Sequence, residues 1–436
     1  MSYVNRWRTA DYLMFGVIMA CMGSTYWGVR GSGGFGGGSG ALLAGAGWAT
    51  WWYLASYVGE GAGRRPYGSA WVLPAIALGI GIGGESGYGV YISWLNGKFN
   101  YNYPDAARQI SPSIGYFMLF LCGLHWGGIA GAFLAWCAPV RPLRWWEWCL
   151  RIALGIGGGA LALWWLRAYP QVHLPFYSEG IYDHPEYKDV QRTRTQIEPV
   201  GSHLGAFLGF LLFEIIRRDW RAVGVMVLMA LGFAIPFSVG AVWHTFNDSG
   251  WNLGWWKHWE MSIGLGGGAA FALVFWLFNR PGDAERKDSI SATTRFFTAD
   301  ALFWLVLVNN VYGAVKGRLK MHEVELSDTA VIAIILIGVG LCTVTVMLRW
   351  RGERIIDLQP DGNRPPLGPF LVVQGSILFA MLMVSIPRSM ELANAVILGT
   401  YALYVAVSAF CAWRLDDRVG SVETIAYVTP GQRFRM

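Results

Sequence analysis

The chain has 436 residues, of which 54% are hydrophobic and 14% are charged, and its formal net charge is +6 at pH 7. Ordinary soluble domains contain about 45–50% apolar and about 25% charged residues, so this composition excludes a soluble globular protein. The positive charge does not indicate nucleic-acid binding, because the arginines are spread over short loops instead of forming one basic face.

Apolar runs of membrane-crossing length recur along the whole chain. An α-helix needs about 20 residues to cross a hydrocarbon core of roughly 30 Å. We predict an all-α polytopic integral membrane protein with about twelve transmembrane helices. The expected spans are residues 11–29, 36–58, 71–95, 112–137, 146–166, 199–216, 221–243, 260–279, 299–314, 328–348, 367–386 and 393–413.

The basic residues are concentrated on one side of these predicted helices. Counting both termini, the loops on that side hold most of the 34 Lys and Arg residues. Cytoplasmic loops carry an excess of Lys and Arg, so we expect both termini in the cytoplasm, with the protein in a bacterial inner membrane. An even number of crossings agrees with this orientation.

A GxxxGA pattern occurs four times at similar places in the predicted hairpins. Its copies are Gly36/Gly40/Ala41, Gly127/Gly131/Ala132, Gly201/Gly205/Ala206 and Gly264/Gly268/Ala269. Small residues four apart lie on one helix face and let two backbones approach closely. We predict that the first eight helices form four parallel two-helix hairpins produced by internal duplication. Residues 1–280 would then form a repeat membrane domain, and residues 281–436 a four-helix C-terminal membrane domain with a short cytoplasmic tail.

The glycine-rich stretch from Gly31 to Gly40 also contains a GxGxxG spacing. No strand precedes it and no βαβ unit can be drawn around it, so nucleotide binding is not predicted. We interpret these glycines as a bend with close helix packing.

Ionisable residues at membrane depth or at its outer edge are the candidate pathway or substrate-binding residues, because charges are costly there. They are Arg30, Glu85, His125, Glu198, His203, His244, Asp248, His258 and Glu260. Arg30 ends the first helix on the side opposite the basic loops, where it should pair, face water or bind an anion. The alternatives are structural: Arg30 can extend to the headgroups, and a carboxylate at a helix start interacts favourably with the helix dipole.

Long outer loops combine Trp and Tyr with polar residues. Examples are "SWLNGKFNYNYPD" from Ser93 and "VWHTFNDSGWNLGWWKHWE" from Val242. The tryptophans can form an interfacial aromatic belt, or they can line a site for a polar organic solute.

The sequence predicts no metal site and identifies no cofactor. His244, His258 and Glu260 fit no compact zinc pattern, and the six cysteines contain no CxxC pair. No GxSxG elbow marks a catalytic serine, so catalytic residues and enzymatic activity are not identified.

Three functions remain open. The first is a transporter or channel for a small polar or charged solute that passes through the repeat bundle. The second is a membrane-embedded enzyme with an outward-facing Glu/His pocket that acts on a lipid-linked or periplasmic substrate. The third is a structural subunit of a membrane protein complex. The expected partners are the lipid bilayer and a small-molecule solute, and a homo-oligomer or a larger complex is left open.

Overall fold

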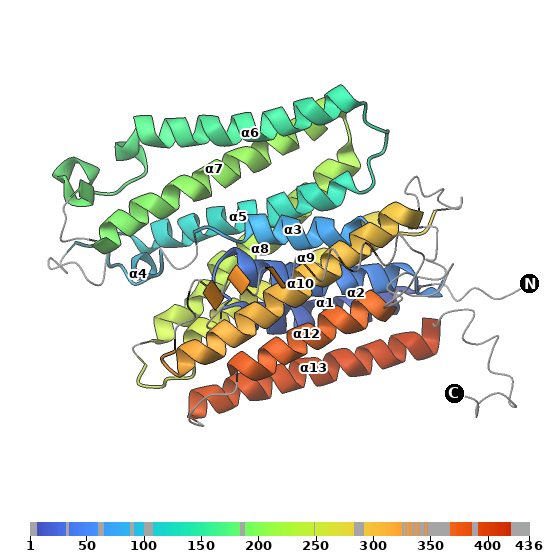
Figure 1. Cartoon of the computed structure of the whole chain (residues 1–436). Helices are drawn as coiled ribbons and strands as arrows, with labels where there is room; N and C mark the ends of the chain where they lie inside the picture. The colour runs from blue at the N-terminus through green and yellow to red at the C-terminus, as the bar shows by residue number, and fades with distance from the viewer. Residues whose placement is uncertain are drawn as a thin grey trace, which may run out of the picture.

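The structure is a computed structural model that describes residues 7–31, 35–59, 65–87, 91–99, 108–183, 188–247, 249–282, 292–324, 367–385 and 391–419, with scattered positions between 327 and 347. Within these residues the regular elements are helices, and Figure 1 shows most of the long ones running roughly side by side. The all-α prediction is confirmed for this part of the chain.

Eight of the described helices are long and apolar enough to cross a membrane, as an integral membrane protein requires. They are α1 (Thr9–Arg30), α5 (Pro112–Trp136), α6 (Trp145–Ala168), α7 (Lys188–Arg217), α8 (Trp220–Val239), α9 (Trp255–Phe278), α12 (Leu367–Ser385) and α13 (Leu392–Val419). The other described helices are α2 (Gly38–Ser56), α3 (Val72–Gly83), α4 (Ile92–Leu95), α10 (Ala292–Met321) and four short 3-10 helices, η2 (Pro170–Val172), η3 (Tyr177–Glu179), η4 (Ile181–Asp183) and η5 (Gly240–Phe246). The count of twelve spans stays a prediction, because most of residues 328–348 lie outside the described part.

The start of α1 and the end of α13 lie at the same end of the bundle. Asp11 is fully buried there and pairs with Arg418 at 3.3 Å. At this end Arg65 Nη1 also donates to Asn279 O at 2.7 Å. We call this end the basic end, and the opposite one, which holds residues 169–183, the loop end. That the basic end faces the cytoplasm stays a prediction.

Aromatic side chains fill the region where α1, α2, α5, α8 and α9 meet. Trp27, Trp48, Trp126, Phe233 and Phe271 are all fully buried. The ring centroids of Trp27 lie 5.8 Å from Trp48 and 5.4 Å from Trp126. These large rings provide dispersion contacts, which matter in a bilayer because lipid removes the hydrophobic drive between helices.

Glycines allow three helix pairs to approach closely. Examples are Gly268 against Met19 O (α9 on α1), Gly127 against Met229 O (α5 on α8) and Gly205 against Gly158 O (α7 on α6), where a Cβ would overlap the facing backbone. In the first GxxxGA copy a Cβ at Gly36 would have no heavy atom within 4 Å, but a Cβ at Gly40 would lie 2.9 Å from the carbonyl oxygen of Arg30. Each copy thus contains a glycine at a close approach.

The packing partners do not follow the predicted hairpins throughout. Helix α9 packs most extensively on α1, and α5 packs most extensively on α8, whereas α6 and α7 are both hairpin neighbours and packing partners. The duplication into four hairpins and the two-domain division remain predictions.

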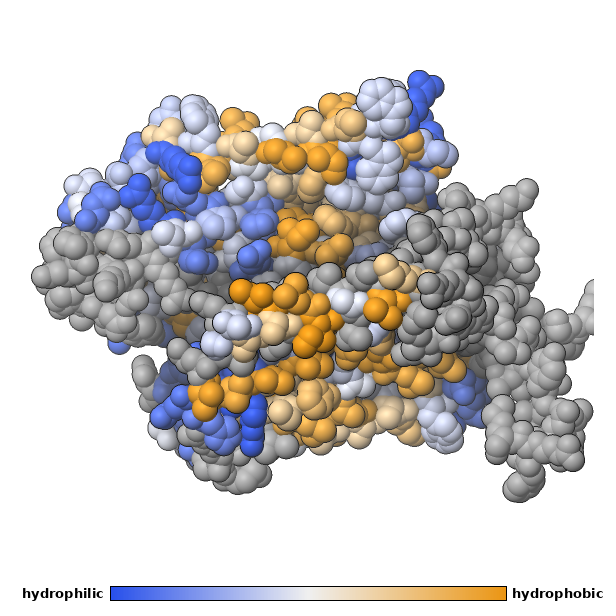
Figure 2. Space-filling model, in the orientation of Figure 1, coloured by the Kyte–Doolittle hydropathy of each residue, from blue (hydrophilic) through white to orange (hydrophobic). Residues whose placement is uncertain are grey.

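The α6–α7 hairpin lies at the edge of the bundle (Figure 1). Helix α6 makes its contacts mainly with α7 and leaves Trp145 and Trp164 exposed at 78% and 59%. Figure 2 shows hydrophobic residues across the middle of the same face and hydrophilic residues gathered towards its ends. This distribution is that of a surface in contact with lipid.

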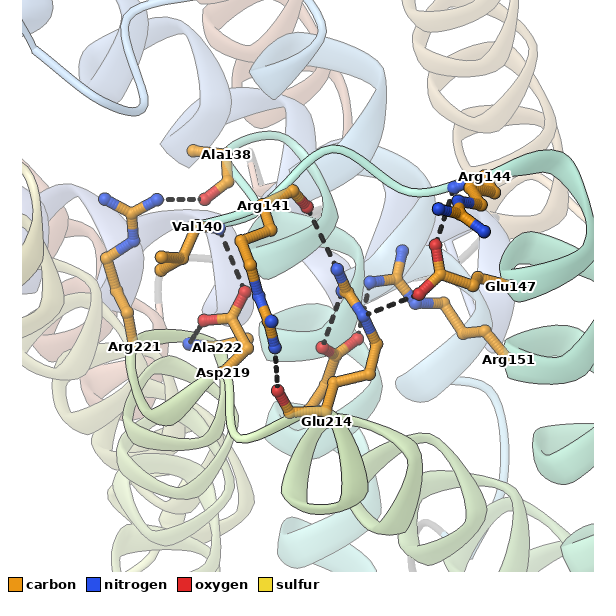
Figure 3. A network of polar contacts seen from close by, with 11 residues as sticks. Ala138, Val140, Arg141, Arg144, Glu147, Arg151, Glu214, Asp219, Arg221 and Ala222 are labelled. Atoms are coloured by element: carbon orange, nitrogen blue, oxygen red, sulfur yellow. Dashed lines mark hydrogen bonds and ion pairs between the residues drawn. The ribbon is translucent and has the colours of Figure 1, made fainter.

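A buried ion pair lies near the basic end of this hairpin (Figure 3). Arg151 Nη2 of α6 and Glu214 Oε1 of α7 are 2.6 Å apart, and the two side chains are 1% and 0% exposed. The Arg151 guanidinium also lies 4.5 Å from the Trp148 ring centroid and 5.2 Å from that of Trp136. A buried pair of this kind holds α6 against α7 as long as both charges are present.

Further polar contacts tie the two turns at the basic end together. Arg141 Nη2 donates to Arg217 O at 2.6 Å, and Arg217 Nη2 donates to Arg141 O at 3.0 Å. Asp219 accepts from the backbone N–H of Val140 at 2.9 Å and of Ala222 at 3.1 Å. Asp219 thereby caps α8 and anchors the α5–α6 turn with one carboxylate.

Candidate functional site

Helix α3 ends inside the membrane-spanning region. It has 12 residues, and at 1.5 Å per residue it reaches about 18 Å, against a hydrocarbon core of about 30 Å. A Cβ at Gly83 would lie 2.6 Å from the carbonyl oxygen of Trp126, which is near the middle of the spanning helix α5. The expected continuous span 71–95 is therefore interrupted. The helix stops at Gly84, and Gly87 has a φ of +84°, a conformation that favours glycine.

Side chains from other helices satisfy the carbonyl groups that follow this interruption. The pairs are Arg30 Nη2 to Gly84 O at 2.8 Å, Trp126 Nε1 to Ser86 O at 2.8 Å and Cys122 Sγ to Gly87 O at 3.6 Å. An unpaired carbonyl in hydrocarbon costs several kcal/mol, so these donors make irregular backbone tolerable at this depth. We call residues 84–87 the α3 break.

Arg30 lies at the C-terminal end of α3. It is only 1% exposed, and its guanidinium lies 5.0 Å from the ring centroids of both Trp27 and Trp126. The end of a helix carries partial negative charge, and aromatic faces attract cations. Both effects stabilise the buried charge of Arg30 at the α3 break.

Two of the predicted histidines meet beside the break. The rings of His125 and His203 stack with centroids 5.5 Å apart. His203 Nδ1 lies 3.2 Å from Ser86 Oγ and 2.7 Å from Pro199 O. His125 is fully buried, and within the described residues neither of its ring nitrogens has a hydrogen-bond partner. A buried ionisable side chain at membrane depth is a candidate functional position.

Glu260 lies on the other side of the α1 terminus. Its side chain is fully buried, and Oε2 is 2.7 Å from Lys257 Nζ. Lys257 Nζ also donates to Gly28 O at 3.0 Å. A Cβ at Gly31 would overlap the Glu260 carboxylate, so this carboxylate packs directly against the residue after Arg30. The end of α1 thus has the positive charge of Arg30 on the side of the α3 break and the negative charge of Glu260 on the side of α9.

Glu85 is the exposed carboxylate of the α3 break. It lies near the start of α2, where a Cβ at Gly38 would be 3.9 Å from Glu85 Cδ. Within the described residues its carboxylate has no hydrogen bond or ion pair. A carboxylate at membrane depth is a functional-site hypothesis by default.

The remaining predicted residues do not join this group. Glu198 pairs with Arg167 at 2.7 Å, and Arg167 is 62% exposed. His258 Nδ1 lies 3.1 Å from a backbone carbonyl at the start of its own helix, and His244 is buried with its ring centroid 5.0 Å from those of two tryptophans. Asp248 lies outside the described residues.

The tryptophans of the η5–α9 region were interpreted either as an interfacial aromatic belt or as the lining of a solute site, and they differ in exposure. Trp251 is 68% exposed, as a belt residue would be, whereas Trp259 is fully buried and donates through Nε1 to Phe237 O at 2.9 Å. The aromatic belt therefore does not account for all of them.

Several residues of the site were not predicted from the sequence. Ser86 contacts the predicted residue His203. Three further residues donate to backbone carbonyl groups near the break or the end of α1, namely Cys122, Trp126 and Lys257. The run "GIGGESG" from Gly81 was a usable signal, because glycines in a helix lower its stability and favour termination.

The described part of the chain contains no group of three or more His, Cys, Asp or Glu side chains placed to hold a metal ion. The side chains at the α3 break instead offer hydrogen-bond donors, an imidazole pair and a carboxylate. Comparison of the chain with protein-family models, with curated proteins and with solved structures gave no match.

Proposed function

We propose that the protein transports a small polar or charged solute across the membrane, with its binding site at the α3 break. The single observation that carries this proposal is a helix that stops at membrane depth with its terminal carbonyl groups bonded by side chains of other helices. Interrupted helices of this kind form the solute and ion sites of many membrane transporters. The backbone of the break is covered by protein, but the Glu85 side chain is exposed, so a solute can reach the break at this residue.

The charges around the break support the same function. Glu85 supplies an exposed carboxylate, Arg30 a buried cation, and His125 and His203 two imidazoles. A polar solute or a coupling cation that reaches the break would find both hydrogen-bond acceptors and donors. In this proposal the pathway connects the loop end to the break, and a rearrangement opens the break towards the basic end.

Accessibility measurements test this pathway. Single cysteines replace Arg30, Glu85, Glu198 and Glu260 in a background without native cysteines, and charged thiol reagents are added from one side of the membrane at a time. We expect Glu85→Cys to react from both sides and Leu13→Cys, which is 63% exposed at the lipid-facing surface, to react from neither. Reaction from the loop end alone would contradict transport and favour an outward-facing pocket. No reaction at any of the four positions would favour a structural subunit.

A membrane-embedded enzyme is the second candidate, and one contact favours it. Ser86 Oγ lies 3.2 Å from His203 Nδ1, and a serine nucleophile needs an imidazole nitrogen at this distance. The same Nδ1 lies 2.7 Å from Pro199 O, which can only accept a hydrogen bond, so in this mechanism the imidazole proton must move from Nδ1 to Nε2 before Nδ1 can act as the base. A fluorophosphonate probe added to the purified protein tests this candidate, with the Ser86→Ala variant as control. Labelling of the unsubstituted protein that Ser86→Ala abolishes would support the enzyme, whereas the transport proposal expects no serine-specific labelling.

A further inference from the structure

A groove of about 700 Å³ lies between α5, α6 and α7, and its lining residue Val200 borders Gly87 of the α3 break. Phe117 and Leu121 of α5, Trp165 of α6, and Leu204 and Leu208 of α7 are among the residues that line it. The volume is in the range of sites for small molecules, about 300–1,000 Å³. The lining is largely apolar, so the groove suits hydrocarbon.

The position of the groove limits what can fill it. All three of its helices are candidate membrane spans, and its lining residues Phe117 and Leu208 are 58% and 52% exposed. Residues with such exposure on a spanning helix face the lipid, so the groove opens sideways to the hydrocarbon core. Any occupant that enters from this side is a component of the membrane.

Polar side chains are confined to one end of the groove. Gln171, His173 and Ser178 of the loop 169–183 line it at the loop end. Burial lowers the pKa of His173, so this imidazole is neutral at pH 7 and can both donate and accept hydrogen bonds. The ion pair of Arg167 and Glu198 is also near this end, because Arg167 lies two residues after the lining residue Trp165 and Glu198 directly follows the lining residue Ile197. A ligand that fits this groove is therefore amphipathic, with its polar part at the loop end.

The size of the groove distinguishes a lipid chain from a helix of a partner protein. A helix with its side chains is about 10–12 Å across, so 700 Å³ would accommodate a helix segment only about 7 Å long. That is little more than one helical turn, too short for a spanning helix to pack along the groove. A single hydrocarbon chain is thinner than a helix and can bend, so a groove of this volume can hold it along its length.

We propose that one acyl chain of a phospholipid occupies this groove, with the phospholipid headgroup beneath the loop 169–183. Helices α5 and α7 also border the α3 break, but the inference rests on the apolar lining of the groove and the proposed function on the polar groups of the break, so separate experiments test the two. Bound in this position, the lipid fills the space that α5 leaves beside the α6–α7 hairpin.

Photocrosslinking tests the occupant directly. The full-length protein is placed in vesicles that contain phosphatidylethanolamine with a diazirine in one acyl chain, irradiated, and digested for peptide mapping. We expect labelling of the α5 and α7 peptides that carry Phe117 and Leu208 to exceed labelling around Leu403, a lipid-facing residue of α13 that is 59% exposed. Equal labelling of the groove and of α13 would overturn the proposal, because it would show only contact with bulk lipid.

Two variants test whether the groove itself is responsible. Leu204→Trp and Leu208→Trp each place an indole in the groove, and Leu403→Trp adds the same ring to an exposed face. In the groove variants the indole should displace about two methylene groups of the acyl chain, which weakens lipid binding about tenfold. Labelling of the Phe117 peptide should fall by the same factor in these variants and stay unchanged in Leu403→Trp. A variant counts as folded when it is monodisperse in detergent. If one of the two groove variants does not fold, the other still provides the test. Unchanged labelling in a folded groove variant, or crosslinks from the groove to a second protein chain, would overturn the proposal.

Discussion

Replacement of Glu214 by glutamine should lower the free energy of unfolding by about 3–5 kcal/mol, because it leaves Arg151 charged and buried without its partner. The two side chains are 0% and 1% exposed, with their closest atoms 2.6 Å apart. Water cannot replace the lost carboxylate at such a site. The measurement is a denaturation midpoint in mixed micelles, followed through the intrinsic fluorescence of the tryptophans.

The same helix supplies a matched control for this prediction. Glu198→Gln also removes one carboxylate from an Arg–Glu pair of α6 and α7, but its partner Arg167 is 62% exposed. Water can solvate Arg167, so the expected loss is about 0–1 kcal/mol. Replacing both partners, as in Arg151→Met with Glu214→Leu, should restore most of the stability lost in Glu214→Gln. Equal losses in the two single glutamine variants would show that burial does not determine the strength of the Arg151–Glu214 pair.

Replacement of Gly268 by valine should destabilise the protein by about 3 kcal/mol or more, because α9 can no longer pack on α1. A Cβ at this position would overlap the carbonyl oxygen of Met19, which is backbone and cannot move out of the way as a flexible side chain would. The two helices would have to separate along the whole contact that also contains Gly264 and Gly23. The same denaturation midpoint measures the loss.

Gly157→Val is the control for this substitution. Gly157 lies in α6, and a Cβ there would have no heavy atom within 4 Å. The valine should therefore cost little, since only the removal of a flexible glycine and a change of helix propensity remain. A destabilisation at Gly157 as large as that at Gly268 would mean that backbone flexibility, and not the close approach of α9 to α1, explains the effect.

The predicted site was only partly assembled by the fold. Arg30, Glu85, His125, His203 and Glu260 were chosen as ionisable residues in apolar surroundings, and in the structure they lie at the α3 break or at the adjacent end of α1. Glu198, His244 and His258 were chosen by the same rule but have their contacts elsewhere, with Arg167, with tryptophan rings and with the start of α9. Composition identifies a residue as unusual for its depth, but not which neighbour it meets, because that depends on the faces that each helix presents.

The sequence by itself determined the class of the protein and the surfaces on which its helices can approach. Long apolar runs must cross a bilayer as helices, because hydrocarbon offers no partner for free backbone groups. Glycines four residues apart make a helix face flat enough for close packing. Both properties are local and can be read along one segment.

Only the tertiary structure decided that α3 stops at Gly84 and that Gly268 packs against Met19. The residues 71–95 are apolar enough for a continuous span, so the interruption depends on donors from Arg30, Trp126 and Cys122. These donors come from other helices and compensate the exposed carbonyl groups. The glycines of residues 81–87 favour a helix end, but only the neighbouring helices supply the donors that make an end at this depth tolerable.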